Sequence, residues 1–156
     1  MLRELQTNGQ KTTDAMYKAD VAMKVGMAVV KNRADMTADI PSAATVEGFY
    51  FVSKERVPTG LNCARGDMSD YDTNFVDIAQ NEPVKLIIPE VGERYGTDQY
   101  VATGLTKGDA LMITDGKFVK ATASTVPSRL IYGGTYNDAG HTLAIVEIAG
   151  ATVTNA

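Results

Sequence analysis

The chain has 156 residues, of which 44% are hydrophobic and 22% charged, values expected for a single folded domain. They exclude collagen-like, coiled-coil and wholly disordered chains. The 15 lysines and arginines against 19 aspartates and glutamates give a formal net charge of -4. We therefore expect no nucleic-acid partner, because an acidic chain is not attracted to a phosphate backbone.

Residues 1–20 predict an N-terminal arm that is weakly structured in isolation. They are polar, contain Asn8 followed by Gly9, and carry only a broken apolar pattern. The apolar residues of this arm are the candidates for contact with a partner surface: Leu2, Leu5, Met16 and Tyr17. The arm has no apolar run typical of a signal peptide, and no aliphatic cluster in the chain is long enough to cross a bilayer. We therefore expect no membrane contact.

Strand signals begin at residue 21. Residues 21–30 are rich in β-branched side chains, and Gly26 within them predicts a bend or bulge. Residues 46–52 predict a second strand, with aromatic and β-branched side chains. Residues 54–77 show little apolar periodicity and predict a long loop, which in a compact domain is usually functional or mobile.

A hairpin at residues 110–121 is the strongest local signal in the chain. Two strand-like runs are separated there by Asp115-Gly116 alone, and this dipeptide favours a type I′ turn because both central positions need a positive φ. Before the hairpin, residues 84–88 and 99–102 predict strands, and residues 92–96 predict a turn.

The chain closes with two further predicted strands, at residues 129–136 and 143–149, joined by turn residues at 137–140. Short strands, glycine-rich turns and no convincing amphipathic helix predict an all-β fold. We expect a compact β-barrel or β-sandwich of short antiparallel strands over residues 21–156, with the arm before it and the long loop at 54–77.

Two residues would have to support an enzymatic function. His141 is the only histidine and could act as a general base, but a structural role at a barrel corner is the expected one, because no nucleophile motif accompanies it. Cys63 is the only cysteine, which excludes an intrachain disulfide and a cysteine-built metal site. We expect a non-enzymatic protein, made in a reducing cytosol, with no cofactor.

The 54–77 loop holds the densest group of carboxylates, Asp67, Asp70, Asp72 and Asp77. Their spacing does not match an EF-hand, so a solvated acidic loop is expected rather than a calcium site. The loop also contains Arg65-Gly66-Asp67, a tripeptide used by adhesive ligands, which we treat as a chance match because any short word of common residues arises in about a few per cent of chains of this length. The candidates for an exposed binding loop are Arg65, Gly66, Asp67, Asp70 and Asp72.

The strand pattern over about residues 21 to 150 resembles the small β-rich capsid decoration (cement) proteins of tailed bacteriophages. The resemblance is carried by residues 105–113 with 117–121, by the closing stretches 132–136, 140–142 and 146–148, and by the opening stretches 25–30 and 48–52. The first 20 residues and the acidic loop lie outside it.

The resemblance implies a structural virion protein that binds and stabilises the assembled phage head. Its partner would be the major capsid protein. It would sit on the outer capsid surface as a homo-oligomer, with a trimer as the expected state, after synthesis in the bacterial host cytoplasm. Two alternatives stay open: a host-recognition or adhesion module that uses the 54–77 loop, and an enzyme that uses His141 and Cys63.

Overall fold

The computed structural model describes residues 1–55, 70–122 and 126–155, and their fold is all-β, as predicted. The strands of the first half are β1 (Leu2–Gln6), β2 (Thr13–Ala19), β3 (Met23–Lys24), β4 (Ala28–Asn32), β5 (Thr37–Asp39) and β6 (Tyr50–Ser53). They are followed by the helical turn α2 (Thr73–Val76) and by β7 (Asp77–Ile78), β8 (Pro83–Ile87), β9 (Arg94–Thr97), β10 (Leu111–Thr114), β11 (Lys117–Lys120), β12 (Ser128–Asp138) and β13 (His141–Val153).

Five strands close a barrel in the order β2-β5-β4-β6-β8. The β2–β5 pair is parallel and the other pairs are antiparallel, so the expected antiparallel pattern has one exception. The barrel interior is filled mainly by small and aliphatic side chains, among them Val29, Val52 and Leu86, each fully buried. Closure leaves these strands without free edges.

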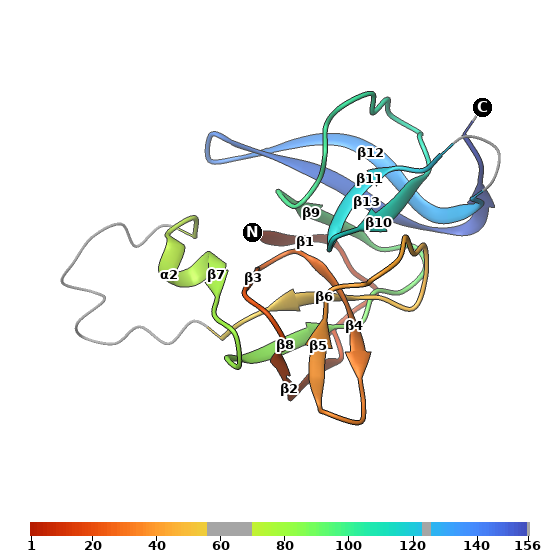
Figure 1. Cartoon of the computed structure of the whole chain (residues 1–156). Helices are drawn as coiled ribbons and strands as arrows, with labels where there is room; N and C mark the ends of the chain where they lie inside the picture. Colours follow the sequence, from red (N-terminus) through yellow and green to blue (C-terminus); the bar gives the residue numbers. More distant parts are fainter. Residues whose placement is uncertain (56–69, 123–125, 156) are drawn as a thin grey trace.

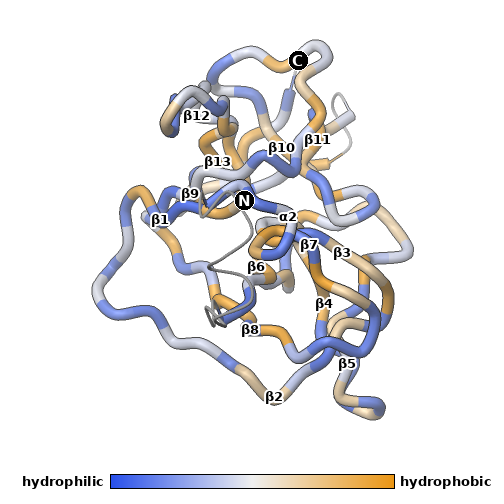
Figure 2. The backbone as a smooth tube through the Cα atoms, turned by 90° about the vertical axis from the view of Figure 1, so that its left-hand side faces the viewer, coloured by the Kyte–Doolittle hydropathy of each residue, from blue (hydrophilic) through white to orange (hydrophobic). Residues whose placement is uncertain are grey.

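A second unit is the antiparallel sheet β1-β9-β13-β12, which packs with the β10–β11 hairpin around an aromatic cluster. Phe51 of the barrel wall contributes to this cluster and lies 4.5 Å from the ring of Tyr95, centroid to centroid. Figure 1 shows the barrel strands in the lower half, the sheet in the upper half and the N terminus between them. Along the backbone, the hydrophobic residues gather in strands such as β8 and β13 (Figure 2).

The prediction of a weakly structured arm at residues 1–20 is wrong. Strand β1 pairs with β9, and β2 is a member of the closed barrel. A register shift between Asp14 and Tyr17 turns the Met16 side chain outward, where it is 75% exposed, while Tyr17 is buried in the barrel core. This irregularity breaks the alternation of apolar residues, so the sequence pattern hides a strand that backbone hydrogen bonds define.

Local turn chemistry is confirmed at the predicted hairpin. Asp115 and Gly116 both have positive φ, 51° and 73°, and they join β10 to β11. The β12–β13 hairpin has the same geometry at Ala139 and Gly140, with φ of 50° and 90°.

The structure corrects three elements that the sequence predicted elsewhere in the chain. The predicted turn at 92–96 is largely strand β9, the predicted strand at 99–102 contributes only a bridge at Tyr100, and the strand predicted at 46–52 begins at Tyr50. At β9, pairing with β1 and β13 overrides the local turn preference, whereas residues 46–49 and most of 99–102 have strand-like side chains but no ladder of strand partners.

Candidate functional site

A polar network joins the barrel to the sheet at the amino end of the chain. The α-ammonium group of Met1 donates a hydrogen bond to the carbonyl oxygen of Val25 and forms an ion pair with Asp98, each at 2.6 Å. Val25 lies between β3 and β4, and Asp98 directly follows β9. Burial lowers the pKa of the Met1 ammonium below its ordinary value, and the carboxylate of Asp98 offsets part of that effect.

Gly26 allows the two units to approach each other. Its φ is +94°, and a Cβ at this position would lie 2.3 Å from the carbonyl oxygen of Met1. The hydroxyl of Thr97 in β9 donates a hydrogen bond of 2.9 Å to the carbonyl oxygen of Gly26. The glycine predicted to mark a bend therefore also allows a close approach between the backbone before β4 and Met1.

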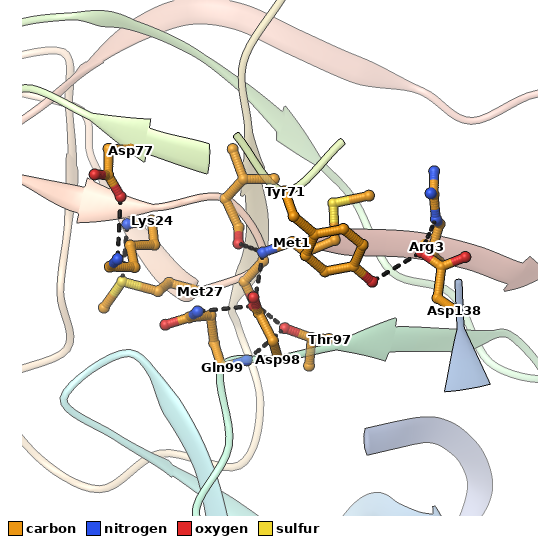
Figure 3. A network of polar contacts seen from close by, with 12 residues as sticks. Met1, Arg3, Lys24, Met27, Tyr71, Asp77, Thr97, Asp98, Gln99 and Asp138 are labelled. Carbon is orange, nitrogen blue, oxygen red and sulfur yellow. Dashed lines mark hydrogen bonds and ion pairs between the residues drawn. The ribbon is translucent and has the colours of Figure 1, made fainter. Parts of the chain in front are cut away.

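Gln99 continues this network beyond Asp98 (Figure 3). Its side-chain nitrogen donates to Asp98 at 2.7 Å, and its backbone N–H donates to the hydroxyl of Thr97 at 3.0 Å. The residue is 7% exposed. In Figure 3 the side-chain oxygen points away from Asp98, and within the part of the chain that the structure describes it accepts no hydrogen bond.

A cleft of about 520 Å³ lies beside Gln99, between the β3–β7 ribbon and the start of β11. Its apolar wall consists of Met23, Met27 and Ile78, all buried, with two exposed alanines at the rim. Its charged residues are Lys24, Asp77 and Lys117.

Charge in the cleft is unequally satisfied. Lys24 and Asp77 form an ion pair of 3.1 Å in which both side chains are about half exposed, 54% and 50%. Lys117 forms no ion pair with any residue in the described ranges 1–55, 70–122 and 126–155. The cleft therefore combines an apolar wall with an excess of positive charge at its opening, on a chain whose net charge is -4.

A second polar cluster forms at the end of the predicted loop. Arg3 of β1 pairs with Asp70 at 2.5 Å and with Asp138 of β12 at 2.7 Å, and the hydroxyl of Tyr71 donates to Asp138 at 2.8 Å. Burial and the bond to Asp138 raise the pKa of Tyr71 well above its usual range. Burial alone would raise the pKa of Asp138, but hydrogen bonds from Arg3 and Tyr71 outweigh it and lower that pKa.

His141 joins this cluster through stacking. Its ring lies 3.6 Å from the ring of Tyr71, centroid to centroid, with an angle of 13° between the planes. It begins β13, as its place at the entrance to the last strand predicts, and it is exposed. Its described contact is with an aromatic ring, and the other residue of the enzymatic hypothesis, Cys63, lies outside the described residues.

The loop candidates have different positions. Asp70 is held by Arg3, and Asp72 caps the helical turn α2 by accepting a hydrogen bond from the N–H of Asn74. Arg65, Gly66 and Asp67 lie outside the described residues. Within the described chain no group of three or more acidic, histidine or cysteine residues is arranged to hold a metal ion.

The four apolar candidates of the first 20 residues do not form one contact surface. Leu2 packs against both hydrophobic clusters, and Leu5 lies beside Gly96. Tyr17 is buried in the barrel, whereas Met16 alone presents a largely exposed side chain. Of these residues, Met16 is therefore the one available to a partner.

The residues of the cleft were not singled out by the sequence. Lys24, Gln99 and Lys117 belong to segments far apart in the chain, and none stands in a recognisable motif. In the sequence, Lys117 is only one position of the predicted hairpin. The one usable signal was Gly26, because a bend before β4 implies that its neighbours face another part of the fold.

No family model, curated protein or solved structure matches the chain. Among the described residues, no helix has the length and apolar character needed to span a membrane. The function is therefore inferred from the residues and their arrangement.

Proposed function

We propose that this chain is a non-enzymatic capsid decoration protein of a tailed bacteriophage. It binds the outer surface of the assembled head through contacts with the major capsid protein and stabilises the shell. It acts as a homo-oligomer, with a trimer as the expected state, and its place is the virion surface after synthesis in the bacterial cytoplasm.

The observation that supports this proposal best is the joined pair of β units. Met1, Gly26 and Thr97 tie the barrel to the sheet through buried backbone and charged contacts. A subunit that braces its neighbours has to transmit force across its own body, and a junction of satisfied polar groups and packed backbone resists bending. The strand pattern that resembles decoration proteins supports the same function.

The stabilising effect requires a difference in affinity. A bound protein stabilises the shell only if it binds the assembled lattice more tightly than the free subunits. Many copies on one head add to this effect, because copies that contact each other raise the effective concentration at neighbouring sites. Modest affinity at each site is then sufficient.

Co-sedimentation tests the proposal directly. The purified chain is mixed with expanded heads of the phage that encodes it, prepared without the chain, and separately with unassembled major capsid protein. We expect the chain to pellet with the heads, to raise their temperature of disruption, and to leave free subunits largely unbound. A chain that stays in the supernatant with the heads contradicts the proposal.

The adhesion alternative has one supporting observation. The return of the 54–77 loop is anchored by Arg3 and by the stacking of Tyr71 on His141, and an anchored end would help a loop present residues to a receptor. Binding of the purified chain to host cells, and its loss when Arg65, Gly66 and Asp67 are replaced by alanine, would support this alternative over the capsid function.

A further inference from the structure

The cleft beside Gln99 has the size and lining of a side-chain binding site. Its volume of about 520 Å³ lies within the usual range for ligand sites. Met23 and Met27 form much of its wall, and methionine side chains adapt to different apolar shapes because they are unbranched and polarisable. An apolar side chain of a partner that enters the cleft would itself leave water and gain hydrophobic free energy.

The charged residues of the cleft indicate which group of the partner lies next to that apolar side chain. Lys117 and Lys24 stand at the cleft, and Asp77 is the one acidic residue among the described residues of its lining, so the local charge favours a carboxylate. The Gln99 oxygen, which accepts no hydrogen bond from the described residues, can accept one from a partner's N–H group.

We infer that this cleft docks a protein segment that carries an apolar side chain next to a carboxylate. The apolar side chain lies against Met23, Met27 and Ile78, and the carboxylate pairs with Lys117. This inference rests on the proposed function and deepens it, since the segment then belongs to the major capsid protein.

A second groove, of about 430 Å³, carries no comparable preference. It is lined by apolar residues such as Phe49 and Leu130, but its charged residues are Glu47 and Arg129, one of each sign. Opposite charges in one lining select neither an acidic nor a basic partner. The cleft at Lys117 is therefore the surface with a defined partner chemistry.

The test uses two variants of the cleft and one matched control. Lys117→Glu reverses the charge of this lysine, and Ala79→Gln places a larger polar side chain at the rim without changing the charge. Lys85→Glu makes the same charge change at an exposed lysine of the barrel strand β8, away from the cleft lining. Binding of each variant to expanded heads is measured by co-sedimentation at several salt concentrations, after circular dichroism has confirmed its fold.

We expect Lys117→Glu to weaken binding to the heads about tenfold or more, with a smaller salt dependence than the wild type. Ala79→Gln weakens binding as well, and Lys85→Glu stays within about twofold of the wild type. The inference is overturned if wild type binds and both cleft variants bind equally well, or if Lys85→Glu loses as much as Lys117→Glu.

Two further outcomes separate the possible failures. If the wild type does not bind heads, the proposed function fails, and this inference fails with it. If light scattering shows that the wild type self-associates and that Lys117→Glu is monomeric, the occupant of the cleft is a second copy of the chain, which overturns docking of a capsid segment while leaving the capsid function standing.

Discussion

Glu93 and Lys24 differ in how deeply their charged groups are buried and how fully these groups are paired. Glu93 is fully buried, and its carboxylate accepts hydrogen bonds from Lys11 at 2.8 Å, from the hydroxyl of Tyr95 at 2.6 Å, and from two backbone N–H groups. Lys24 stands half exposed at the cleft, and its ion pair within the described part of the chain is with Asp77 at 3.1 Å. The charge of Glu93 is therefore satisfied by groups of this chain, whereas the ammonium group of Lys24 is partly exposed and can still bind a further group.

The difference separates residues that hold the fold from residues that are free to bind. Removing one member of a buried and satisfied network leaves the others unpaired at high cost, whereas changing a half-exposed charge alters stability little. The following substitutions test this division, in decreasing order of the expected loss of stability.

Glu93→Gln is expected to have the largest effect. It leaves the ammonium group of Lys11, whose side chain is only 6% exposed, without its close charged partner. We expect the free energy of unfolding to fall by about 3–5 kcal/mol, measured by urea denaturation. Glu90→Gln is the matched control, because the Glu90 side chain is 54% exposed and lies 4.0 Å from Lys11; an equal loss there would contradict the division.

The pH dependence of stability in acid should also report on Glu93. Burial alone would raise the pKa of Glu93, but the hydrogen bonds from Lys11 and Tyr95 outweigh it and lower this pKa from 4.5 to about 2. The stability that the ionised carboxylate contributes is therefore present above pH 4.5 and is lost as the pH falls from 4.5 toward 2. Glu93→Gln should show a shallower loss of stability in this range; parallel curves for wild type and variant would argue against the assignment.

Gly26→Ala tests the contact between barrel and sheet. The new Cβ would meet the Met1 carbonyl oxygen at 2.3 Å with φ at +94°, so we expect a loss of at least about 3 kcal/mol from clash and backbone strain together. Gly9→Ala is the control, since Gly9 has φ at +119° but no heavy atom within 4 Å of the added Cβ. Thermal unfolding should show a clearly smaller shift for Gly9→Ala, and equal shifts would mean that the close approach is unimportant.

Asp98→Asn removes the charged partner of the Met1 ammonium. We expect a loss of about 1–2 kcal/mol near pH 6, measured by urea unfolding. The pKa of this ammonium lies below 8.0 in the folded chain because the group is buried, so folded-state stability rises as the pH increases toward 8.0. The difference between wild type and Asp98→Asn should therefore shrink above pH 9, where the amine is neutral in both; a constant difference would exclude the ion pair as its cause.

The smallest effect is expected in the cleft. Lys24→Gln and Lys117→Gln should each change the free energy of unfolding by less than about 0.5 kcal/mol, because both side chains are largely solvated. Equilibrium unfolding of the two variants checks this. A loss above 2 kcal/mol for either would place these lysines with Glu93 among the residues that hold the fold.

The sequence by itself determined what depends on neighbouring residues. Asp115-Gly116 forms its turn because both residues must adopt positive φ, and two short strands beside such a turn pair almost without alternatives. The all-β class and the bend at Gly26 follow from equally local preferences.

Only the tertiary structure decided which distant segments meet. Strands β1 and β2 could not be recognised, because a bulge interrupts their side-chain pattern and the hydrogen bonds that define them lead to β9, β5 and β8. The cleft was hidden for the same reason, since Lys24, Gln99 and Lys117 line one cleft only when the β3–β7 ribbon, the segment after β9 and the β10–β11 hairpin come together. Spacing along a chain reports local conformation, whereas a binding surface depends on contacts between residues that are far apart in sequence.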